Sequence, residues 1–312
     1  MYYVVRVTRT FSYWIRLARP PFHLVGIFPF VLGAVLAYHV AGTFNPGILV
    51  FGLLAVVAIM LATYYAGEYY DFEGDKLSGQ MERNRFSGGT QTLVEGLLSK
   101  KPVLLGAYIS LGVAAACGLI LQFAFRTGVL TIPLGAVGMF AGFFYSTPPV
   151  RWVKRGVGEI LIGICYGWLP IAVAFYLQTG TLNEMIFWMA VPVGLTIFNV
   201  ILINEFPDHP ADTLVEKRNL VVRFGREKAA WIYVSASAIS WLFFVMSVLR
   251  GLPSIAWILY LPVLAISLYI TLLVAVRAYR KAATLERICA LTIVVNLGTS
   301  LAYILCLTKG LI

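Results

Sequence analysis

Residues 184–212, EMIFWMAVPVGLTIFNVILINEFPDHPAD, join a long apolar run to an acidic end, and this combination decides the fold class. Between Met185 and Asn204 the run carries no charged residue, and carboxylates follow from Glu205 onward. A helix needs roughly 20 apolar residues to cross the hydrocarbon core of a bilayer. We therefore expect a transmembrane helix that delivers an acidic motif to one membrane surface.

Eight further stretches of comparable length are apolar, so the sequence predicts nine transmembrane helices. The composition agrees, because 60% hydrophobic and 12% charged residues in a chain of 312 leave too little polar surface for a water-soluble globule. A membrane β-barrel would show segments of about 10 residues that alternate in polarity, and no such alternation is found. The expected spans are residues 22–41, 47–67, 102–123, 127–147, 159–178, 184–204, 229–249, 253–276 and 286–308.

The Lys and Arg residues are distributed unequally among the segments that connect these spans. With Arg287 counted in the segment before the last span, 21 of the 24 lie in the N-terminal tail and every second segment after it. Because cytoplasmic segments carry the excess of Lys and Arg, we expect a cytoplasmic N-terminus, cytoplasmic acidic loops and an external C-terminus. The net charge of +10 then reflects membrane topology and predicts no nucleic-acid partner. We expect an integral protein of a bacterial or archaeal plasma membrane.

The acidic residues gather in two places. Of 14 Asp and Glu residues, 6 lie between Glu68 and Glu95 and 5 between Glu205 and Glu227. The nine residues GEYYDFEGD, 67–75, match NEFPDHPAD, 204–212, at a constant offset of 137, and each follows an apolar span. The chain therefore reads as two related halves, each with one acidic motif on a cytoplasmic loop.

Each motif places two aspartates four residues apart, which puts both carboxylates on one helix face. The pairs are Asp71 with Asp75 and Asp208 with Asp212. Two such pairs facing one cavity would repel unless a cation lay between them. Mg²⁺ favours one or two carboxylates together with phosphate oxygens, so we expect a Mg²⁺-bound phosphorylated substrate. Basic residues that follow the motifs are suited to bind its phosphates: Lys76, Arg83, Arg85, Lys217, Arg218 and Arg223. The alternative is a solvated rim of acids and bases at the membrane surface.

These motifs resemble the UbiA superfamily of intramembrane prenyltransferases, whose signature is two Asn-x-x-x-Asp-x-x-x-Asp motifs on cytoplasmic loops of a nine-helix bundle. Asn204, Asp208 and Asp212 match it in full, whereas the first motif has Gly67 in the Asn position. Further matches are Ala18-Arg19-Pro20, Tyr145-Ser146-Thr147-Pro148-Pro149 and Lys217-Arg218-Asn219-Leu220. The resemblance implies a single domain over residues 1–312, an all-α membrane protein with nine transmembrane helices around a central cavity in two pseudo-repeated halves.

The resemblance also implies an activity, the transfer of a polyprenyl group from an allylic diphosphate to an aromatic acceptor with Mg²⁺ as cofactor. Residues 87–96, SGGTQTLVEG, are most similar to the Gly-Gly-Ser loop of the 1,4-dihydroxy-2-naphthoate prenyltransferases of menaquinone synthesis. Asn84-Arg85-Phe86 lies partway towards the Asn-Arg-Pro pattern of other branches. Alternative acceptors are therefore 4-hydroxybenzoate and homogentisate. Expected partners are the polyprenyl diphosphate, the acceptor and the lipid bilayer, without an obligate protein partner.

Roles for further residues follow from the same resemblance. Tyr145 is expected to be catalytic beside the diphosphate, and the expected diphosphate ligands are Arg19, Arg83, Arg85, Ser146, Lys154, Asn204, Lys217 and Arg218. Aromatic rings in the cavity could stabilise an allylic cation, and the candidates are Tyr64, Tyr65, Tyr69, Phe144, Tyr145 and Tyr166. Structural alternatives stay open for three of these residues: Tyr145 as an interfacial tyrosine, Arg19 as a membrane anchor and Lys154 as a topology signal.

An ion-coupled secondary transporter is the alternative from a different functional class. Acidic residues in two repeated halves also mark such carriers, but their substrate sites lie near the bilayer midplane. The motifs here follow the ends of the spans and have basic neighbours. We therefore expect an enzyme.

Overall fold

The computed structural model describes residues 2–81, 84–86 and 88–309, and side chains from residue 10 to residue 308 within these ranges. All regular secondary structure in the described residues is helical, which confirms the predicted fold class. The elements are α1 (Tyr2–Ala18), α2 (Pro20–Ala41), α3 (Pro46–Tyr70), α4 (Phe72–Gly79), α5 (Lys100–Leu119), η1 (Ile120–Ala124), α6 (Thr131–Phe143), η2 (Trp152–Lys154), α7 (Gly158–Gly163), η3 (Ile164–Trp168), α8 (Leu169–Thr179), α9 (Met185–Leu214), α10 (Leu220–Leu249), α11 (Ala256–Ala275), η4 (Ala278–Arg280) and α12 (Ala282–Lys309).

Each of the nine apolar stretches expected to span the membrane is helical. Within the described residues, eight helices are long and apolar enough to cross a bilayer, counting α5 with η1 as one and α7, η3 and α8 as another. The ninth is α6, a shorter apolar helix of 13 residues. It is shorter than the expected span 127–147 because Gly128 turns the chain with a φ of +107° before it and the backbone leaves the helix at Phe144.

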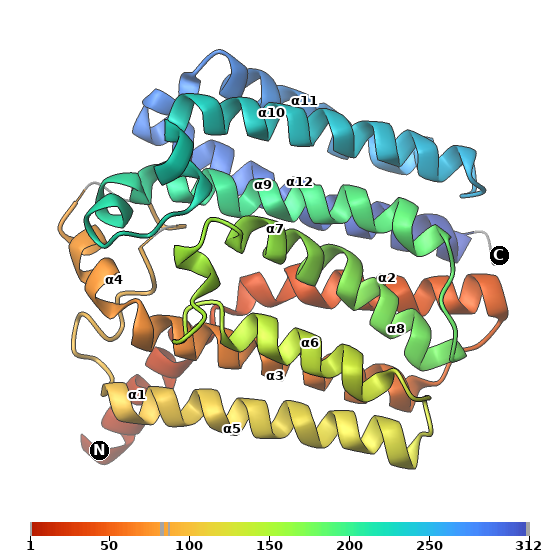
Figure 1. Cartoon of the computed structure of the whole chain (residues 1–312), viewed down its shortest axis with the longest axis horizontal. Coiled ribbons are helices and arrows are strands. Elements are labelled where there is room, and N and C mark those ends of the chain that lie inside the picture. Colours follow the sequence, from red (N-terminus) through yellow and green to blue (C-terminus); the bar gives the residue numbers. More distant parts are fainter. Residues whose placement is uncertain (1, 82–83, 87, 310–312) are drawn as a thin grey trace.

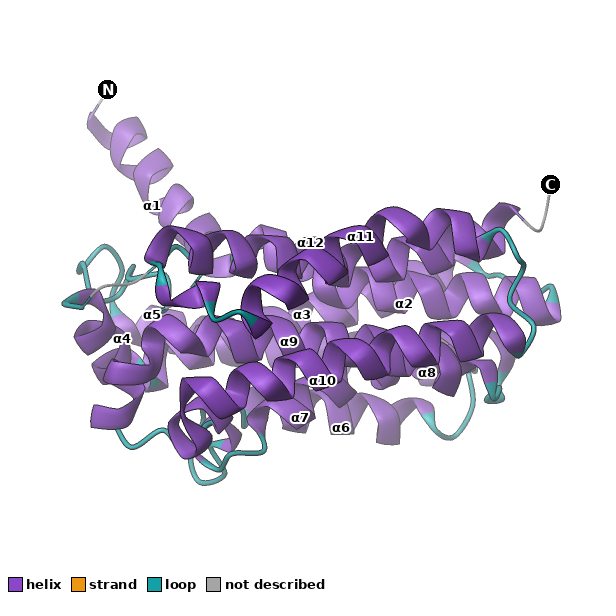
Figure 2. Ribbon diagram, turned by 90° about the horizontal axis from the view of Figure 1, so that it is seen from above, coloured by secondary structure: helices purple, strands orange, loops and turns teal. Residues whose placement is uncertain are grey.

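The five basic segments lie at one end of the helix bundle. In Figure 1 α1, α4 and the connections after α6, α9 and α11 all lie at the left end, and the C-terminal end of α12 lies at the right. The sequence did not predict α1, which leaves the bundle at an angle (Figure 2). The alternation of basic segments thus predicted correctly which connections share an end.

The acidic motifs lie on helices, and the expectation that both lie in loops was wrong. Helix α9 continues ten residues beyond the expected end at Asn204, so the whole second motif is helical. The first motif is divided, because α3 ends at Tyr70, Asp71 lies between α3 and α4, and Asp75 belongs to α4. Helix α3 packs on α5 and α9 packs on α10, so each motif-bearing helix packs on a long helix that follows it.

A close contact between small residues fixes the middle of the bundle. A Cβ atom built on Gly167 would lie 2.4 Å from Cα of Gly194 on α9, so the two backbones touch at these glycines. Small residues permit such close approach in membrane helices. The contact coincides with η3, a π-helical turn, and such turns often occur at functional sites. Because Tyr166 belongs to this turn, the packing sets where its side chain enters the bundle.

Candidate active site

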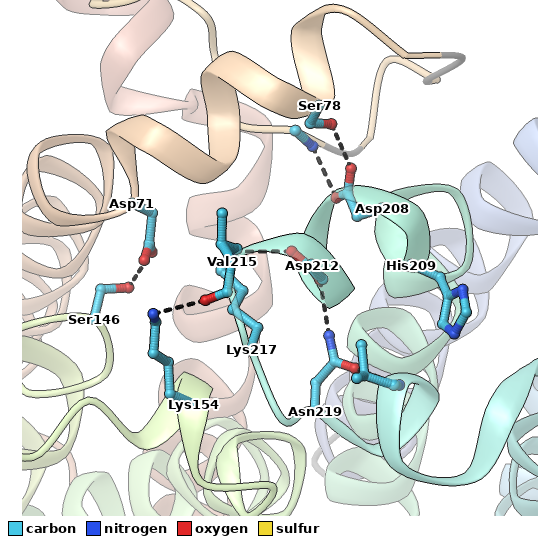
Figure 3. Close-up of polar contacts among 12 residues, drawn as sticks. Asp71, Ser78, Ser146, Lys154, Asp208, His209, Asp212, Val215, Lys217 and Asn219 are labelled. Atoms are coloured by element: carbon cyan, nitrogen blue, oxygen red, sulfur yellow. Dashed lines mark hydrogen bonds and ion pairs between the residues drawn. The ribbon is translucent and has the colours of Figure 1, made fainter.

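Both acidic motifs line one cavity at the basic end of the bundle. The cavity encloses about 1420 Å³ including its open mouth, and its wall contains Asp71, Asp75, Asp208 and Asp212. Sequence spacing predicted two carboxylate pairs, and the fold brings both pairs to the same space. Figure 3 shows three of these aspartates approaching one another from the two halves of the chain.

Asp71 is held by residues that follow α6. Ser146 Oγ donates a hydrogen bond to Oδ2 of Asp71, and the Arg151 guanidinium lies 3.6 Å from Oδ1. Oδ1 is buried and accepts no hydrogen bond from the described part of the chain. This oxygen of Asp71 therefore has the Arg151 charge nearby and still has capacity to bind a cation.

Asp75 is buried under the loop that follows α4. A Cβ atom built on Gly89, whose φ is +63°, would lie 2.2 Å from Oδ2 of Asp75, so this position admits only glycine without displacing the carboxylate. Burial raises the pKa of the Asp75 carboxyl to about 8; Lys217 opposes this rise, whereas Glu68 and Asp71 add to it. Bringing a cation to Asp75 would favour its charged form.

The same loop ties the two motifs together through its backbone. The Gly88 N–H donates to Oδ2 of Asp208 at 2.9 Å, and the Thr90 N–H donates to Oε1 of Glu68 at 2.7 Å. Ser78 Oγ donates to the other oxygen of Asp208 at 2.7 Å. The glycine-rich loop therefore lines the cavity and links the first half of the chain to α9.

Lys217 is the central cation of the site. Its Nζ lies 3.3 Å from Oδ1 of Asp212, and Asn219 donates to Oδ2 of the same carboxylate at 2.8 Å. Burial lowers the pKa of the Lys217 ammonium, but the nearby motif carboxylates outweigh this effect, so that the net pKa is above its usual value. Lys217 therefore stays charged at any physiological pH.

Several other expected site residues also line this cavity: Arg19, Tyr64, Tyr145, Ser146, Tyr166 and Asn204. Arg19 donates to Oε1 of Glu68 at 2.9 Å and lies 6.0 Å from the Tyr64 ring centre. Burial lowers the pKa of the Arg19 guanidinium, but Glu68 more than compensates and the net pKa is raised. Oδ1 of Asn204 is buried and accepts no hydrogen bond within the described residues.

Other expected residues are not brought to the cavity. Arg85 is 73% exposed and pairs with Glu286 at 2.9 Å, and Arg218 is exposed. Lys154 donates to the carbonyl oxygen of Val215 at 2.8 Å, pointing between Ser146 and Lys217 in Figure 3. Arg83 lies outside the described residues.

The aromatic candidates divide in the same way. Tyr65 and Phe144 pack in a separate apolar cluster with Leu17, and Tyr69 packs edge-on against Tyr70. Tyr64, Tyr145 and Tyr166 remain as rings of the cavity wall. Helical register separates these residues, since neighbours such as Tyr64 and Tyr65 point about 100° apart on a helix.

Sequence reasoning missed several residues that shape the site. Arg151 reaches Asp71 although its charge alone is explained by topology, and Ser78 and Asn219 bind the second-motif aspartates. Glu205 lines the cavity as well. One of these residues had a signal in the sequence: the repeat at offset 137 aligns Glu205 with Glu68, so a second glutamate could have been expected in the site.

A second, apolar cavity continues from the first into the bundle. The two share Thr63, Gly142, Cys165 and Tyr166, and the deeper one is lined by apolar residues of α2, α3, α5, α6 and α8. The molecule therefore offers a charged chamber at one end, joined to an apolar one of membrane depth.

Known proteins share both the sequence pattern and the fold. A sequence model of the UbiA prenyltransferase family matches residues 27–294. The 1,4-dihydroxy-2-naphthoate octaprenyltransferase of Bacillus subtilis is 25% identical over 241 residues, which is 77% of this chain and 74% of that protein. A UbiA homologue from Aeropyrum pernix superposes with a TM-score of 0.70 at 16% identity, over 93% of this chain and 98% of its own. A UbiA homologue from Archaeoglobus fulgidus bound to GPP and Mg²⁺ superposes with a TM-score of 0.62 at 20% identity, over 92% and 99%.

Proposed function

The chain belongs to the UbiA prenyltransferase family, and from this premise we propose that it transfers a polyprenyl group from an allylic diphosphate to 1,4-dihydroxy-2-naphthoate. The product, after loss of the acceptor carboxyl group, is a demethylmenaquinol. The observation that carries the proposal is the meeting of both aspartate pairs in one cavity that continues into an apolar one. A charged head group and a long hydrocarbon tail are the two parts of a polyprenyl diphosphate.

The donor set fits Mg²⁺ held jointly by protein and substrate. Among the described residues no three His, Cys, Asp or Glu side chains are grouped so as to hold a metal by themselves. Mg²⁺ takes one or two carboxylates and completes its shell with phosphate oxygens and water, which suits Asp71, Asp75, Asp208 and Asp212. Oδ1 of Asp71, which accepts no hydrogen bond within the described residues, supports this assignment. When bound, Mg²⁺ neutralises charge that develops on the departing diphosphate.

The chain's own residues bind and orient the diphosphate. Lys217 and Arg19 keep their charge in the cavity, as the raised pKa of each requires. Asn204 and Ser146 supply polar groups to the cavity wall, and Gly88 and Gly89 line the cavity, with Gly88 bound to Asp208. Preorganised charges in a water-poor site are an effective means of stabilising a leaving group.

The apolar cavity is suited to the prenyl tail. It begins at Tyr166 and Cys165, where the two cavities join, and it continues between α3, α6 and α8. Tyr64, Tyr145 and Tyr166 surround the junction and offer ring faces to an allylic cation. The reactive carbon of the donor would therefore lie at this junction.

A panel of acceptors tests the choice of substrate. Purified protein in liposomes receives a polyprenyl diphosphate, Mg²⁺ and either 1,4-dihydroxy-2-naphthoate, 4-hydroxybenzoate or homogentisate, and the products are identified by mass. We expect turnover with the naphthoate. Reaction with another acceptor but none with the naphthoate would replace the proposed substrate.

We also propose that the end carrying both motifs faces the cytoplasm and that the chain folds as one domain. The excess of Lys and Arg at that end supports this orientation. An Arg85→Cys variant would react with a membrane-impermeant maleimide in inside-out vesicles and remain protected in intact cells. Labelling in intact cells would reverse the orientation.

The transporter alternative is weakened by depth, because both aspartate pairs lie at one end of the bundle. Substrate flux across proteoliposomes without Mg²⁺-dependent release of diphosphate would favour a carrier.

A further inference from the structure

Two glutamates lie on the packed helices α7 and α9. Glu205 lies on α9 and lines the cavity, whereas Glu159 lies on α7 and is 1% exposed. Their carboxyl groups lie within reach of a mutual hydrogen bond. Oε1 of Glu159 accepts from the Leu220 N–H at 2.5 Å, at the start of α10. This contact fixes the Glu159 side chain through one of its oxygens.

Neither glutamate is neutralised in the way a structural ion pair would be. Oε2 of Glu159 and Oε2 of Glu205 are both buried, and neither accepts a hydrogen bond from any donor in the described residues. The other charged or titratable groups that face Glu205 are Tyr145, Asp212 and Lys217, and Lys217 is already paired with Asp212. Two carboxylates in contact repel when both are charged, and a single shared proton relieves this repulsion. The doubly charged pair is therefore suited to take up one proton from a ligand.

The equivalent residue of the first motif provides an internal comparison. Glu68 occupies the position that matches Glu205 at the offset of 137. It pairs with Arg19 at 2.9 Å and accepts the Thr90 N–H at 2.7 Å, so its charge is satisfied within the protein. The two halves thus use the same residue differently: among the described residues Glu68 has an ion-pair partner, whereas Glu205 has a buried oxygen that accepts no hydrogen bond.

Glu205 lies at a depth in the cavity where it could contact an acceptor. It precedes Asp208 by three residues on α9, so it lies about one helical turn deeper than the diphosphate site on the same face. Tyr145 and Glu205 line the same cavity, and Tyr145 also lies near Glu159, because a Cβ atom built on the preceding residue, Gly158, would lie 3.4 Å from the Tyr145 hydroxyl oxygen. Burial, together with Glu205 and Glu159, raises the pKa of Tyr145, which therefore remains a hydrogen-bond donor. An aromatic ring at this depth would lie beside the reactive carbon of the donor.

We propose that the Glu205–Glu159 pair binds a phenolic hydroxyl group of the acceptor and takes its proton during prenyl transfer. The inference rests on the proposed function and assigns the part of the site that handles the acceptor. Glu205 contacts the acceptor and is the catalytic residue. Glu159 acts through Glu205 and is a positioning residue.

The step balances without an oxidant or a reductant. The hydroxyl proton passes to the pair, and the acceptor carbon that bears the carboxylate forms a bond to the allylic carbon of the donor. At the same time the bond between the allylic carbon and the diphosphate oxygen breaks, and diphosphate leaves. The product is a ketone that carries the carboxylate on the adjacent carbon, and it loses CO₂ to leave an enolate. The enolate oxygen then takes the proton back from Glu205, which restores the pair and forms the prenylated hydroquinone.

The test separates acceptor chemistry from donor binding. Glu205→Gln and Glu159→Gln are compared with the wild type for kcat, for KM of the naphthoate and for the dissociation constant of a prenyl thiolodiphosphate that does not ionise. General acid–base groups contribute about 100-fold to 10,000-fold, so we expect kcat to fall by about 100-fold in Glu205→Gln at neutral pH. Donor binding should stay within about twofold, since the diphosphate contacts are unchanged.

The pH dependence distinguishes a proton acceptor from a structural residue. With Glu205→Gln the rate should rise about tenfold per pH unit as the acceptor hydroxyl ionises in solution, whereas the wild type should show a shallower profile. Glu286→Gln, which changes a surface partner of Arg85, is the matched control and should behave as the wild type. Glu159→Gln retains an oxygen for the Leu220 N–H, so it preserves the start of α10 while removing the shared proton site.

Wild-type kcat and pH profile in both variants would overturn the proposal, as would a loss of donor binding equal to the loss of turnover. If the wild type prenylates another hydroxylated aromatic and not the naphthoate, the same comparison is made with that acceptor. Failure of the wild type with every aromatic acceptor would refute the proposed function itself, and this result is recognised before any variant is measured.

Discussion

Replacing Gly89 by alanine should disable the site through a single methyl group. The new Cβ would lie 2.2 Å from Oδ2 of Asp75, and ordinary van der Waals contact begins at 3.4 Å, so the loop and the carboxylate must separate by about 1.2 Å. Misplacement of a catalytic group by about 1 Å can cost about 100-fold in rate. We therefore expect kcat/KM of Gly89→Ala to fall by at least about 100-fold, measured as prenylated product per minute with purified protein in liposomes.

Gly96→Ala is the matched control for backbone strain. Gly96 belongs to the same connection and has a φ of +67°, but a Cβ atom there would meet nothing within 4 Å. Both variants should lose about 1–2 kcal/mol from the left-handed backbone, seen as similar falls in melting temperature, whereas only Gly89→Ala should lose activity. Equal activity of the two variants would refute the inference that Gly89 sets the position of Asp75.

Two further changes test the diphosphate and tail sites. Arg151→Ala should lower kcat/KM about tenfold, because charge-assisted contacts contribute about 1.5–3 kcal/mol. Arg85→Ala, on the exposed surface, is the control and should stay near the wild type. Steady-state kinetics over a range of donor concentrations measure both, and a wild-type kcat/KM in Arg151→Ala would remove this residue from the site. Gly135→Leu should fill open space in the apolar cavity and reduce turnover of long prenyl donors more than that of short ones. Gly112→Leu, which lies outside that cavity, is the control and should leave the length preference unchanged. Product masses from a mixture of donor lengths measure this preference, and an unchanged preference in Gly135→Leu would place the tail elsewhere.

The fold and the positions of the four motif aspartates could be predicted from sequence because each depends on a simple repeat. Apolar length located the eight helices of the described residues that are long enough to span a membrane and the shorter apolar helix α6, and the alternation of Lys and Arg predicted which connections share an end of the bundle. The constant offset of 137 located both aspartate pairs. These signals are local in sequence or periodic, so they need no knowledge of how helices pack.

The surroundings of the aspartates could not be predicted because they depend on tertiary contacts across the chain. Arg151 and Lys154 share one short basic segment, yet only Arg151 reaches Asp71, because η2 directs Lys154 to the backbone of Val215. Glu68 and Glu205 align in sequence, yet within the described residues only Glu68 has a basic partner at ion-pair distance. Charge and position in the sequence are equal in such cases, and the fold decides which partner each side chain meets.

The most direct test of the central claim is prenyl transfer by Asp71→Ala and Asp208→Ala, one from each motif. Both proteins are inserted in liposomes and assayed for Mg²⁺-dependent release of diphosphate from the prenyl donor and for product. Each lacks a carboxylate that faces the same cavity, so we expect turnover to fall below detection in both while the protein stays inserted and folded. Full activity in both variants would contradict the conclusion that the two motifs form one diphosphate site.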